Sequence, residues 1–321
     1  MRRALVWVIA GCGFSPNHQT QASGSDAAID GTPGAPPDAE MLDALDLSRD
    51  CMPLWQNGTI AFYPPVALTE LDTLAVERDP FVSQDELTIY FSQEHALAGG
   101  GVDADIFTAT REHVGDPFGS ATPFAVVDTT SYESKMSISI DGLTLVVCRS
   151  ASPAGDDEYL ATRTSTSDPW PTPQLNDMDD VNLNYAPYDP ELGSDGRTLY
   201  FAPIADEGDP QQLAVATRSS TTAEFEVQAV PGYTAGSNTN DADPWADPTG
   251  RLFLFSRSIV GVGDTDIVYA LGSNFANVMP VPDVNTVGTS DGDAWLSPNG
   301  CRLYFSSNRA GSYDLYVANA K

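Results

Sequence analysis

The stretch DPWADPTGRLFLFS, residues 243–256, decides the fold because its pattern recurs along the chain. It joins a short extended run to a turn built on Pro and Gly, and then to a second run of β-forming residues. Five such blocks align without gaps, 56, 54, 54 and 50 residues apart, and they begin at Asp79, Lys135, Asp189, Asp243 and Asp293. Self-similarity at a nearly constant period predicts a repeat architecture.

Two further segments follow each block and also predict strands. A third run of β-formers lies downstream, such as DIFTATR from Asp105 and DLYVANA from Asp314. A fourth segment opens on an aromatic residue, as at Phe118, Trp170 and Phe225. Four short strands in a unit of about 54 residues are typical of a propeller blade. The sequence therefore predicts an all-β fold, a five-bladed β-propeller with four-stranded blades.

The position at which the repeat is cut predicts how the ring closes. The last unit stops after its third run, and a lone segment at Phe62 precedes the first block by 17 residues. The same interval elsewhere is 17 to 19 residues. We expect residues 62–68 to supply the missing outer strand and to pair with residues 314–320. This pairing would remove an open sheet edge, which otherwise invites aggregation.

The repeated pattern resembles a known family. D-P-x-x-S-x-D-G-x-x-L-Y-F-S, followed by Asp-Leu-Tyr-Val or Asp-Ile-Phe, is similar to the TolB-like, WD-repeat-like β-propeller repeat of bacterial envelope proteins, over residues 62–321. The resemblance implies a periplasmic or surface propeller used for protein contacts. TolB-type members usually have six blades, so five blades depart from that pattern. Lys135 in place of the leading Asp, and Gln212 in place of the Asp that opens a third strand, depart from it as well.

The amino-terminal sequence predicts a targeting signal rather than a folded element. Residues 1–11 read as a signal peptide, and Ile9-Ala10-Gly11-Cys12 resembles the lipobox of bacterial lipoproteins, which implies that Cys12 carries lipid. The apolar run is too short to span a bilayer, which takes about 20 residues. Residues 12–50 are rich in Gly, Ser, Pro and Asp and predict a disordered tether, and residues 51–321 form the propeller. We expect a membrane-anchored lipoprotein of the cell envelope, periplasmic or on the outer surface.

Composition restricts the partners. The net charge is −30, from 45 acidic and 15 basic residues, which excludes the basic footprint of a nucleic-acid-binding protein. Most of these acids also suit solvated turns. We expect a monomer that contacts the membrane only through its anchor and binds an envelope protein or a polysaccharide. The four cysteines lack C-x-x-C spacing and give no support to a zinc site. Cys51 and Cys301 should lie near each other if the ring closes as predicted, so a disulfide between them is an open alternative.

The leading aspartates are the candidate metal ligands. Asp79, Asp189, Asp243 and Asp293 should begin the innermost strands of four blades and so face the central channel. Carboxylates that converge from several blades suit a divalent cation, and Ca²⁺ fits an all-oxygen set best. The alternative is architectural, because a residue that recurs with the fold can fasten one blade to the next. Lys135 can also offset the repulsion among the four carboxylates.

Two indoles are the candidate ligand-binding residues. Trp245 and Trp295 stand where the first block has Phe81, near an inner strand. They could stack on a sugar or a peptide, or they could fill the core, as aromatic residues at recurring positions commonly do.

We expect the chain to bind a ligand or protein and not to be an enzyme. Residues 288–292 spell G-x-S-x-G, but they lie in a polar turn without the strand and helix that a nucleophile elbow requires. The alternative is a carbohydrate-active enzyme or lectin that uses acidic and aromatic residues at the channel mouth. Five-bladed propellers include glycosidases that place carboxylates there, and Glu191 is the one inner-strand glutamate in the blocks.

Overall fold

The computed structural model describes residues 48–321, except 98–99, 152–154, 176–177, 185–186, 205–209, 229–237, 262 and 273–276. The predicted signal peptide, the predicted lipid site Cys12 and the tether up to residue 47 lie outside the described residues. Within the described part, no helix is both long and apolar enough to cross a bilayer.

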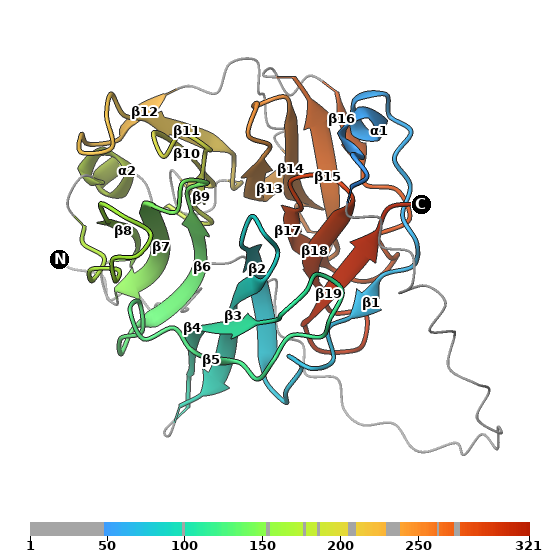
Figure 1. Ribbon diagram of the computed structural model, residues 1–321, viewed down its shortest axis with the longest axis horizontal. Coiled ribbons are helices and arrows are strands. Elements are labelled where there is room, and N and C mark those ends of the chain that lie inside the picture. Colours follow the sequence, from blue (N-terminus) through green and yellow to red (C-terminus); the bar gives the residue numbers. More distant parts are fainter. Residues whose placement is uncertain are drawn as a thin grey trace.

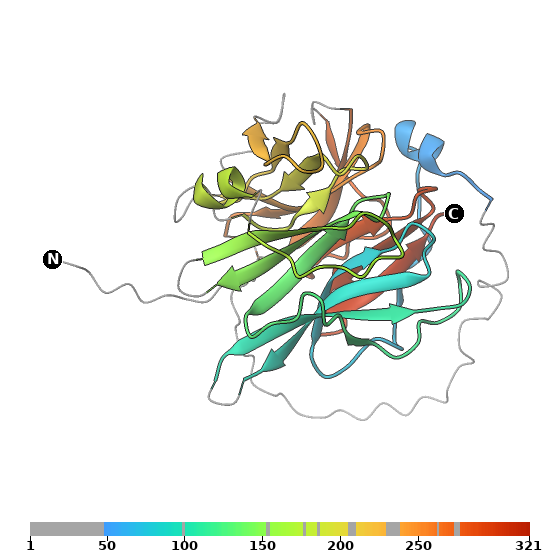
Figure 2. The same ribbon diagram turned by 60° about the vertical axis from the view of Figure 1, so that its left-hand side comes forward.

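Five antiparallel sheets stand around a central axis, with strands β2, β6, β9, β13 and β17 nearest the centre (Figure 1). The first four blades run outward from the inner strand in chain order, and the fifth takes its outermost strand from the N-terminal segment. Each sheet is tilted against its neighbours (Figure 2). The predicted five-bladed propeller is confirmed.

The strand bounds follow the repeat. The first blade holds β2 (Val76–Val82), β3 (Thr88–Ala96), β4 (Val102–Thr110) and β5 (Thr122–Pro123). The second holds β6 (Tyr132–Ile138), β7 (Thr144–Ala151) and β8 (Gly155–Thr162), with a single bridge from Leu160 to Gln174 at its outer edge. The third holds β9 (Glu191–Leu192), β10 (Thr198–Phe201), β11 (Ala214–Thr217) and β12 (Glu226–Gln228).

The remaining elements complete the ring. The fourth blade holds β13 (Thr239–Ala246), β14 (Leu252–Ile259), β15 (Thr265–Leu271) and β16 (Val278–Pro280). The fifth holds β17 (Asp291–Leu296), β18 (Arg302–Ser307), β19 (Asp314–Asn319) and the N-terminal β1 (Val66–Ala67). Two short helices are described, α1 (Met52–Gln56) and α2 (Asp179–Asn184).

A bulge in the inner strand explains why the leading residue is aspartate. The register between β13 and β14 shifts between Ala242 and Trp245, and the first and fifth blades shift at the same place. Asp79, Asp189, Asp243 and Asp293 have φ of 55°, 58°, 51° and 55°. Among residues with a side chain, Asp and Asn tolerate this left-handed conformation best. The left-handed backbone at these four positions therefore favours Asp, whereas Lys135, at the same register shift in the second blade, is not among the residues with positive φ.

An arginine fixes the outer part of three blades. Arg111 of the first blade donates from Nε to the carbonyl oxygen of Glu86 in the turn after the inner strand, at 2.8 Å. Its guanidinium lies over the Phe118 ring, 4.3 Å from the centroid. Arg163 with Trp170, and Arg218 with Phe225, repeat this arrangement. The aromatic residue that opens each fourth segment is thus held against its own blade.

The N-terminal segment closes the ring on the last blade. Val66 pairs with Val317 and Ala67 with Tyr316 in an antiparallel ladder, and an isolated bridge joins Phe62 to Ala320. The predicted pairing of residues 62–68 with 314–320 is therefore confirmed.

A disulfide and a short helix reinforce the closure. Cys51 is bonded to Cys301, with their Cα atoms 5.1 Å apart. Helix α1 follows at once and lies beside the C-terminal end of the chain (Figures 1 and 2). Its Trp55 is fully buried and donates from Nε1 to the carbonyl oxygen of Gly300 at 2.9 Å.

Candidate functional site

The candidate site is the channel enclosed by the five inner strands. Along β13, Asn240, Ala242 and Asp243 line a cavity at one end, which we call the polar end. Trp245 and Ala246 line a second hollow at the other end, which we call the aromatic end. Between them lies the charged centre, formed by Asp79, Lys135, Asp189, Asp243 and Asp293.

The charged centre brings together all four predicted aspartates. Its five side chains belong to residues that are only 0 to 8% exposed. One carboxylate oxygen from each of Asp79, Asp189 and Asp243 lies within 4.8 Å of the others. Lys135 stands among them, with Nζ 3.7 Å from Asp243 Oδ1. The residue that breaks the repeat therefore supplies the positive charge that the aspartates need.

Burial divides the carboxyl groups into two kinds. It raises the pKa of Asp79 to about 6 and the pKa values of Asp189 and Asp293 well above the ordinary value. Burial also acts on Asp243, but Lys135 and hydrogen bonds from neighbouring groups outweigh it and hold the pKa of Asp243 below its usual range. The pKa values of Asp189 and Asp293 are therefore shifted upward by burial, whereas that of Asp243, beside the ammonium group, is shifted downward.

Serines complete the hydrogen bonding of most leading aspartates. Ser92 Oγ donates to Asp79 Oδ2 at 2.7 Å, and Ser306 Oγ donates to Asp293 Oδ2. Ala202 occupies the equivalent position in the third blade. Accordingly, Asp189 Oδ1 is buried without a hydrogen-bond partner among the described residues.

The predicted Ca²⁺ site meets a competitor in Lys135. The orphaned oxygen of Asp189 and the convergence of three carboxylates fit an oxygen-liking cation. The ammonium of Lys135 already lies in the same place, and burial raises the pKa values of two of the carboxyl groups. A cation here has to share the site with Lys135. Binding of Ca²⁺ by this cluster stays a prediction.

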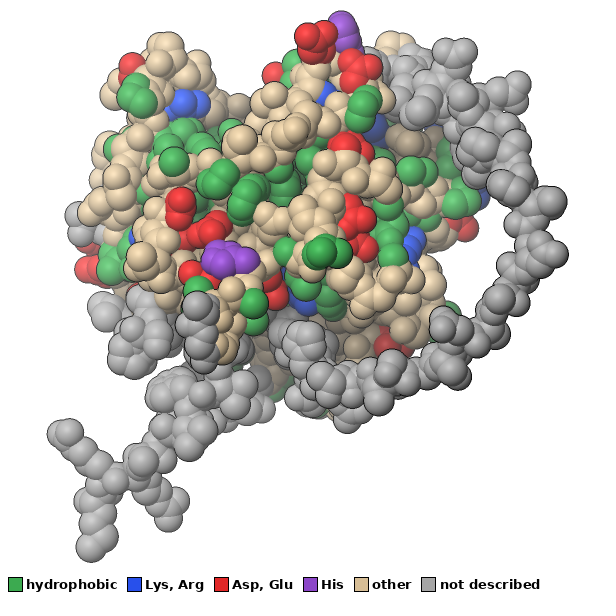
Figure 3. Space-filling view, turned by 90° about the horizontal axis from the view of Figure 1, so that it is seen from below, with side chains coloured by type: hydrophobic (Ala, Val, Ile, Leu, Met, Phe, Trp, Pro, Cys, Tyr) green, Lys and Arg blue, Asp and Glu red, His purple; other side chains and the backbone are tan. Residues whose placement is uncertain are grey.

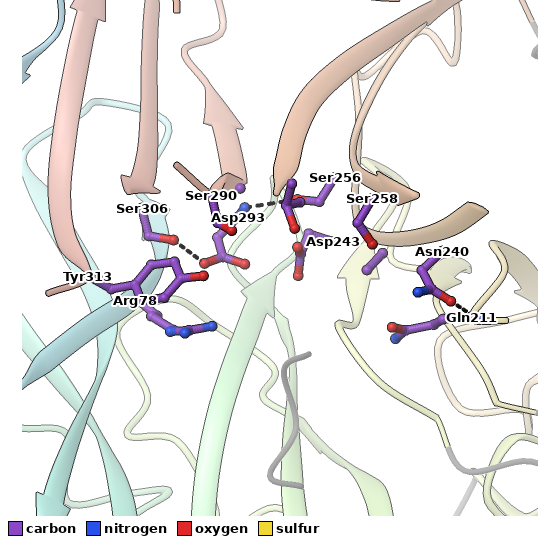
Figure 4. Close-up of a pocket in the computed structure, with 13 residues that line it drawn as sticks. Arg78, Gln211, Asn240, Asp243, Ser256, Ser258, Ser290, Asp293, Ser306 and Tyr313 are labelled. Carbon is purple, nitrogen blue, oxygen red and sulfur yellow. Dashed lines mark hydrogen bonds between the residues drawn. The ribbon is translucent and has the colours of Figure 1, made fainter. Parts of the chain in front are cut away.

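The polar end is a small cavity that opens above the charged centre (Figure 4). Its volume is about 30 Å³, which is room for one or two water molecules or a hydroxyl group. Its lining is hydrogen-bonding almost throughout and includes Arg78, Gln211, Asn240, Asp243, Asp293, Tyr313 and four serines. The Arg78 guanidinium lies over the Tyr313 ring at 3.5 Å, and Asn240 Oδ1 accepts from the Gln211 backbone N–H at 3.0 Å.

The aromatic end contains the two predicted indoles and a buried glutamate. Trp245 is 6% and Trp295 is 3% exposed. The Trp295 ring packs edge-on against Phe81 and Tyr304, with centroids 6.3 and 5.8 Å apart. Both indoles line the hollow there together with Glu191. Most of their surface is packed in the core, and ligand binding by Trp245 and Trp295 stays a prediction.

Because of Glu191, we predict that the free energy of unfolding of the protein falls as pH rises. Burial raises its pKa from 4.5 to about 8, although Lys135 lowers it. The folded protein therefore holds a proton that the unfolded chain has released, so the stability from Glu191 is present in acid and is lost as pH rises toward about 8. We expect the wild type to lose about 2 kcal/mol more than Glu191→Gln between about pH 6 and 8. Urea unfolding at each pH measures this, and parallel curves for the two proteins would contradict it.

Sequence analysis missed a second set of charged residues, which lie two residues before the first residue of a repeat block. In three blades an acidic residue at this position binds an arginine. Arg149 Nε lies 2.8 Å from Glu133 Oε1, Arg257 Nε 2.7 Å from Asp241 Oδ1, and Arg309 bonds Asp291 Oδ1 at 2.5 Å. Extending the repeat alignment upstream by two residues would have shown the acids, because the blocks were cut at the leading residue.

Comparison with known proteins identifies the fold of the chain but not its family. No protein-family model matches the sequence, and no curated protein matches it. TolB from Acinetobacter baumannii is similar in structure, with 14% identity, a TM-score of 0.45 and coverage of 78% of this chain and 56% of that one. A family 117 glycoside hydrolase from Zobellia galactanivorans has 13% identity, a TM-score of 0.53 and coverage of 81% and 90%. A thermostable family 43 glycoside hydrolase has 12% identity, a TM-score of 0.51 and coverage of 79% and 92%.

The two glycoside hydrolases share the propeller fold of this chain and correct one prediction. The expectation that the chain is not an enzyme is wrong, because glycoside hydrolases share its fold along most of their length. The missing strand and helix of a nucleophile elbow excluded only one kind of hydrolase chemistry. Propeller folds serve both in binding proteins and in hydrolases, so the function of this chain has to be argued from the residues of its site.

Proposed function

We propose that this chain is a carbohydrate-active propeller that receives a glycan at the polar end of its channel. The observation that carries the proposal is a pair of carboxyl groups, Asp293 and Asp243, that line the same cavity. Burial raises the pKa of Asp293, whereas Lys135 and neighbouring hydrogen bonds lower the pKa of Asp243. Two carboxyl groups whose pKa values are shifted apart can serve as the acid and the base of glycoside hydrolysis.

The rest of the cavity suits hydroxyl-rich ligands. Its lining carries the guanidinium of Arg78, the side-chain amide of Asn240 and four serine hydroxyls. These groups include both hydrogen-bond donors and acceptors. A cavity of about 30 Å³ admits a hydroxyl group while the ring lies over the mouth. In such a complex Asp293 is the group able to give a proton to a glycosidic oxygen, and Asp243 is the group able to accept one from water.

A screen of oligosaccharides and polysaccharides tests the proposal with two readouts, binding and release of new reducing ends. Asp293→Asn is the informative variant, because the amide has the shape of the protonated carboxyl group but cannot give up its proton. We expect the wild type to cleave at least one glycan and Asp293→Asn to lose 10²-fold or more of that rate. Binding without cleavage would identify a lectin. Neither binding nor cleavage of any glycan would refute the proposal.

A second candidate is an envelope-anchored module that binds a protein segment. It is favoured by the charge of −30, which appears on the surface as many acidic and few basic side chains on the face in Figure 3. A basic peptide would be drawn to such a surface. The lipid anchor at Cys12 and the envelope location are part of this proposal. A pull-down from envelope extract, run beside the glycan screen, separates the two candidates.

A further inference from the structure

Three carboxylates meet where the ring closes, away from the channel centre. Asp72 lies in the loop between β1 and β2, Glu77 lies on β2 of the first blade, and Asp314 is the first residue of β19 in the fifth. One oxygen from each lies within 4.8 Å of the others. The backbone N–H of Glu77 also donates to the Tyr313 carbonyl oxygen at 3.0 Å. The group, which we call the closure triad, therefore joins the first blade to the last.

The closure triad lacks the arginine that its counterparts have. Glu77 holds the position of the acids that bind Arg149, Arg257 and Arg309 in other blades. The residue across the ladder from Glu77 is Gln93, whereas Glu133 of the second blade faces Arg149. None of the ion pairs among the described residues involves a member of the closure triad. We expect functional residues at positions where one repeat departs from the others. The junction at Glu77 lacks the one positive charge that an arginine supplies in three other blades.

One side-chain oxygen of Glu77 has no hydrogen-bond partner among the residues that the structure describes. The residue has no exposed surface. Its Oε1 accepts from the Thr73 hydroxyl at 2.5 Å and from Gln93 Nε2 at 3.0 Å, but Oε2 is buried and unpartnered within this described part of the chain. A buried carboxylate oxygen without a partner is costly. Burial, together with Asp72, raises the pKa values of both Glu77 and Asp314, and no basic side chain is among the causes.

We infer that the closure triad binds a divalent cation of the Ca²⁺ class, which fastens the first blade to the last. The ligands are all carboxylate oxygens, which Ca²⁺ prefers, and the absence of His and Cys from the triad disfavours Zn²⁺. Asp72 is exposed and gives the ion a way in from solvent, while Glu77 and Asp314 are buried. The cation takes the place of the missing arginine and satisfies Glu77 Oε2.

The junction between the first and second blades provides an internal control. Asp105, Asp128 and Glu133 form a triad with the same spacing, one oxygen from each within 4.8 Å. There, Arg149 Nε donates to Glu133 Oε1 at 2.8 Å, and Arg149 also binds the Val127 carbonyl oxygen. Its positive charge is already in place, so this triad is expected to bind no cation.

The test compares melting and calorimetric titration of the full chain in Ca²⁺ and in chelator. We expect Ca²⁺ at about 100 times its Kd to raise the melting temperature of the wild type by about 5 °C. Asp72→Asn should abolish the rise and the heat of binding, and because Asp72 is exposed the variant should fold. Asp128→Asn, the matched change at the junction between the first and second blades, should leave both unchanged.

A gain-of-charge variant tests the same inference in the opposite direction. Gln93→Arg restores the arginine found in the second and fourth blades, so it should raise the melting temperature in chelator and remove the response to Ca²⁺. No response in the wild type, or a full response in Asp72→Asn, would overturn the inference. Loss of the response in Asp79→Asn but not in Asp72→Asn would move the cation to the charged centre and overturn it as well. None of these readouts depends on glycan binding.

Discussion

Lys135→Met should cost the folded protein about 3 to 5 kcal/mol, more than any other single change at the channel. Lys135 is 6% exposed and is the ammonium group at the charged centre, with its Nζ 3.7 Å from Asp243. Burial lowers the pKa of Lys135, yet the surrounding aspartates outweigh it and raise that pKa, so the side chain is charged in the folded state. Methionine keeps most of the volume but leaves four buried carboxyl groups facing one another.

Denaturant unfolding measures this loss, and the chain offers a matched control. Lys321, the only other lysine, pairs with Asp283 on the surface, where both side chains are more than 40% exposed. Exposed pairs contribute about 0 to 1 kcal/mol, so Lys321→Met should change little. Equal, small effects of both variants would show that the aspartates hold themselves together by sharing protons.

Removing the closure disulfide should lower the free energy of unfolding by about 4 kcal/mol. Cys51 and Cys301 are 250 residues apart in sequence, so their bond restricts nearly the whole unfolded propeller. Loop-closure entropy grows with the logarithm of loop length, which places this bond near the upper end of the usual range. The double variant Cys51→Ser, Cys301→Ser leaves no unpaired thiol at this site.

Chemical unfolding of the double serine variant beside the oxidised wild type measures the effect. Strand β1 and helix α1 remain in this variant, so the ring should still close and the transition should stay cooperative. An unchanged midpoint would mean that β1 pairing with β19 supplies the closure by itself. A broad, non-cooperative transition would mean that the bond, and not the ladder, holds the last blade.

The architecture could be predicted because each repeat contains the strand and turn residues that determine its own local structure. The turn after the inner strand shows this, since Gly142, Gly196, Gly250 and Gly300 all adopt positive φ there. Glu86 takes the same conformation, with φ 57°, without being glycine. Its carboxylate binds Arg302 and Tyr304 of the last blade. The alignment marked the position as a turn but could not show that this corner is also a contact between blades.

The site could be predicted only in part. Equivalent positions in a closed ring must face one another, which brought Asp79, Asp189, Asp243 and Asp293 together. Their proton affinities differ because of burial and Lys135, and neither distance nor burial can be obtained from the repeat. The closure triad was missed for a similar reason, since pairing Glu77 with Gln93 requires the strand register beyond the bulge.

The most direct test of the glycan site compares two variants that each replace a buried acid by its amide. Asp293→Asn lies at the polar end and Glu191→Gln at the aromatic end, and burial raises the pKa of both acids. With the best glycan from the screen, the account predicts at least a 10-fold loss of affinity or a 10²-fold loss of cleavage in Asp293→Asn and wild-type behaviour in Glu191→Gln. The reverse pattern, or equal behaviour of the two variants, would contradict the assignment of the glycan to the polar end.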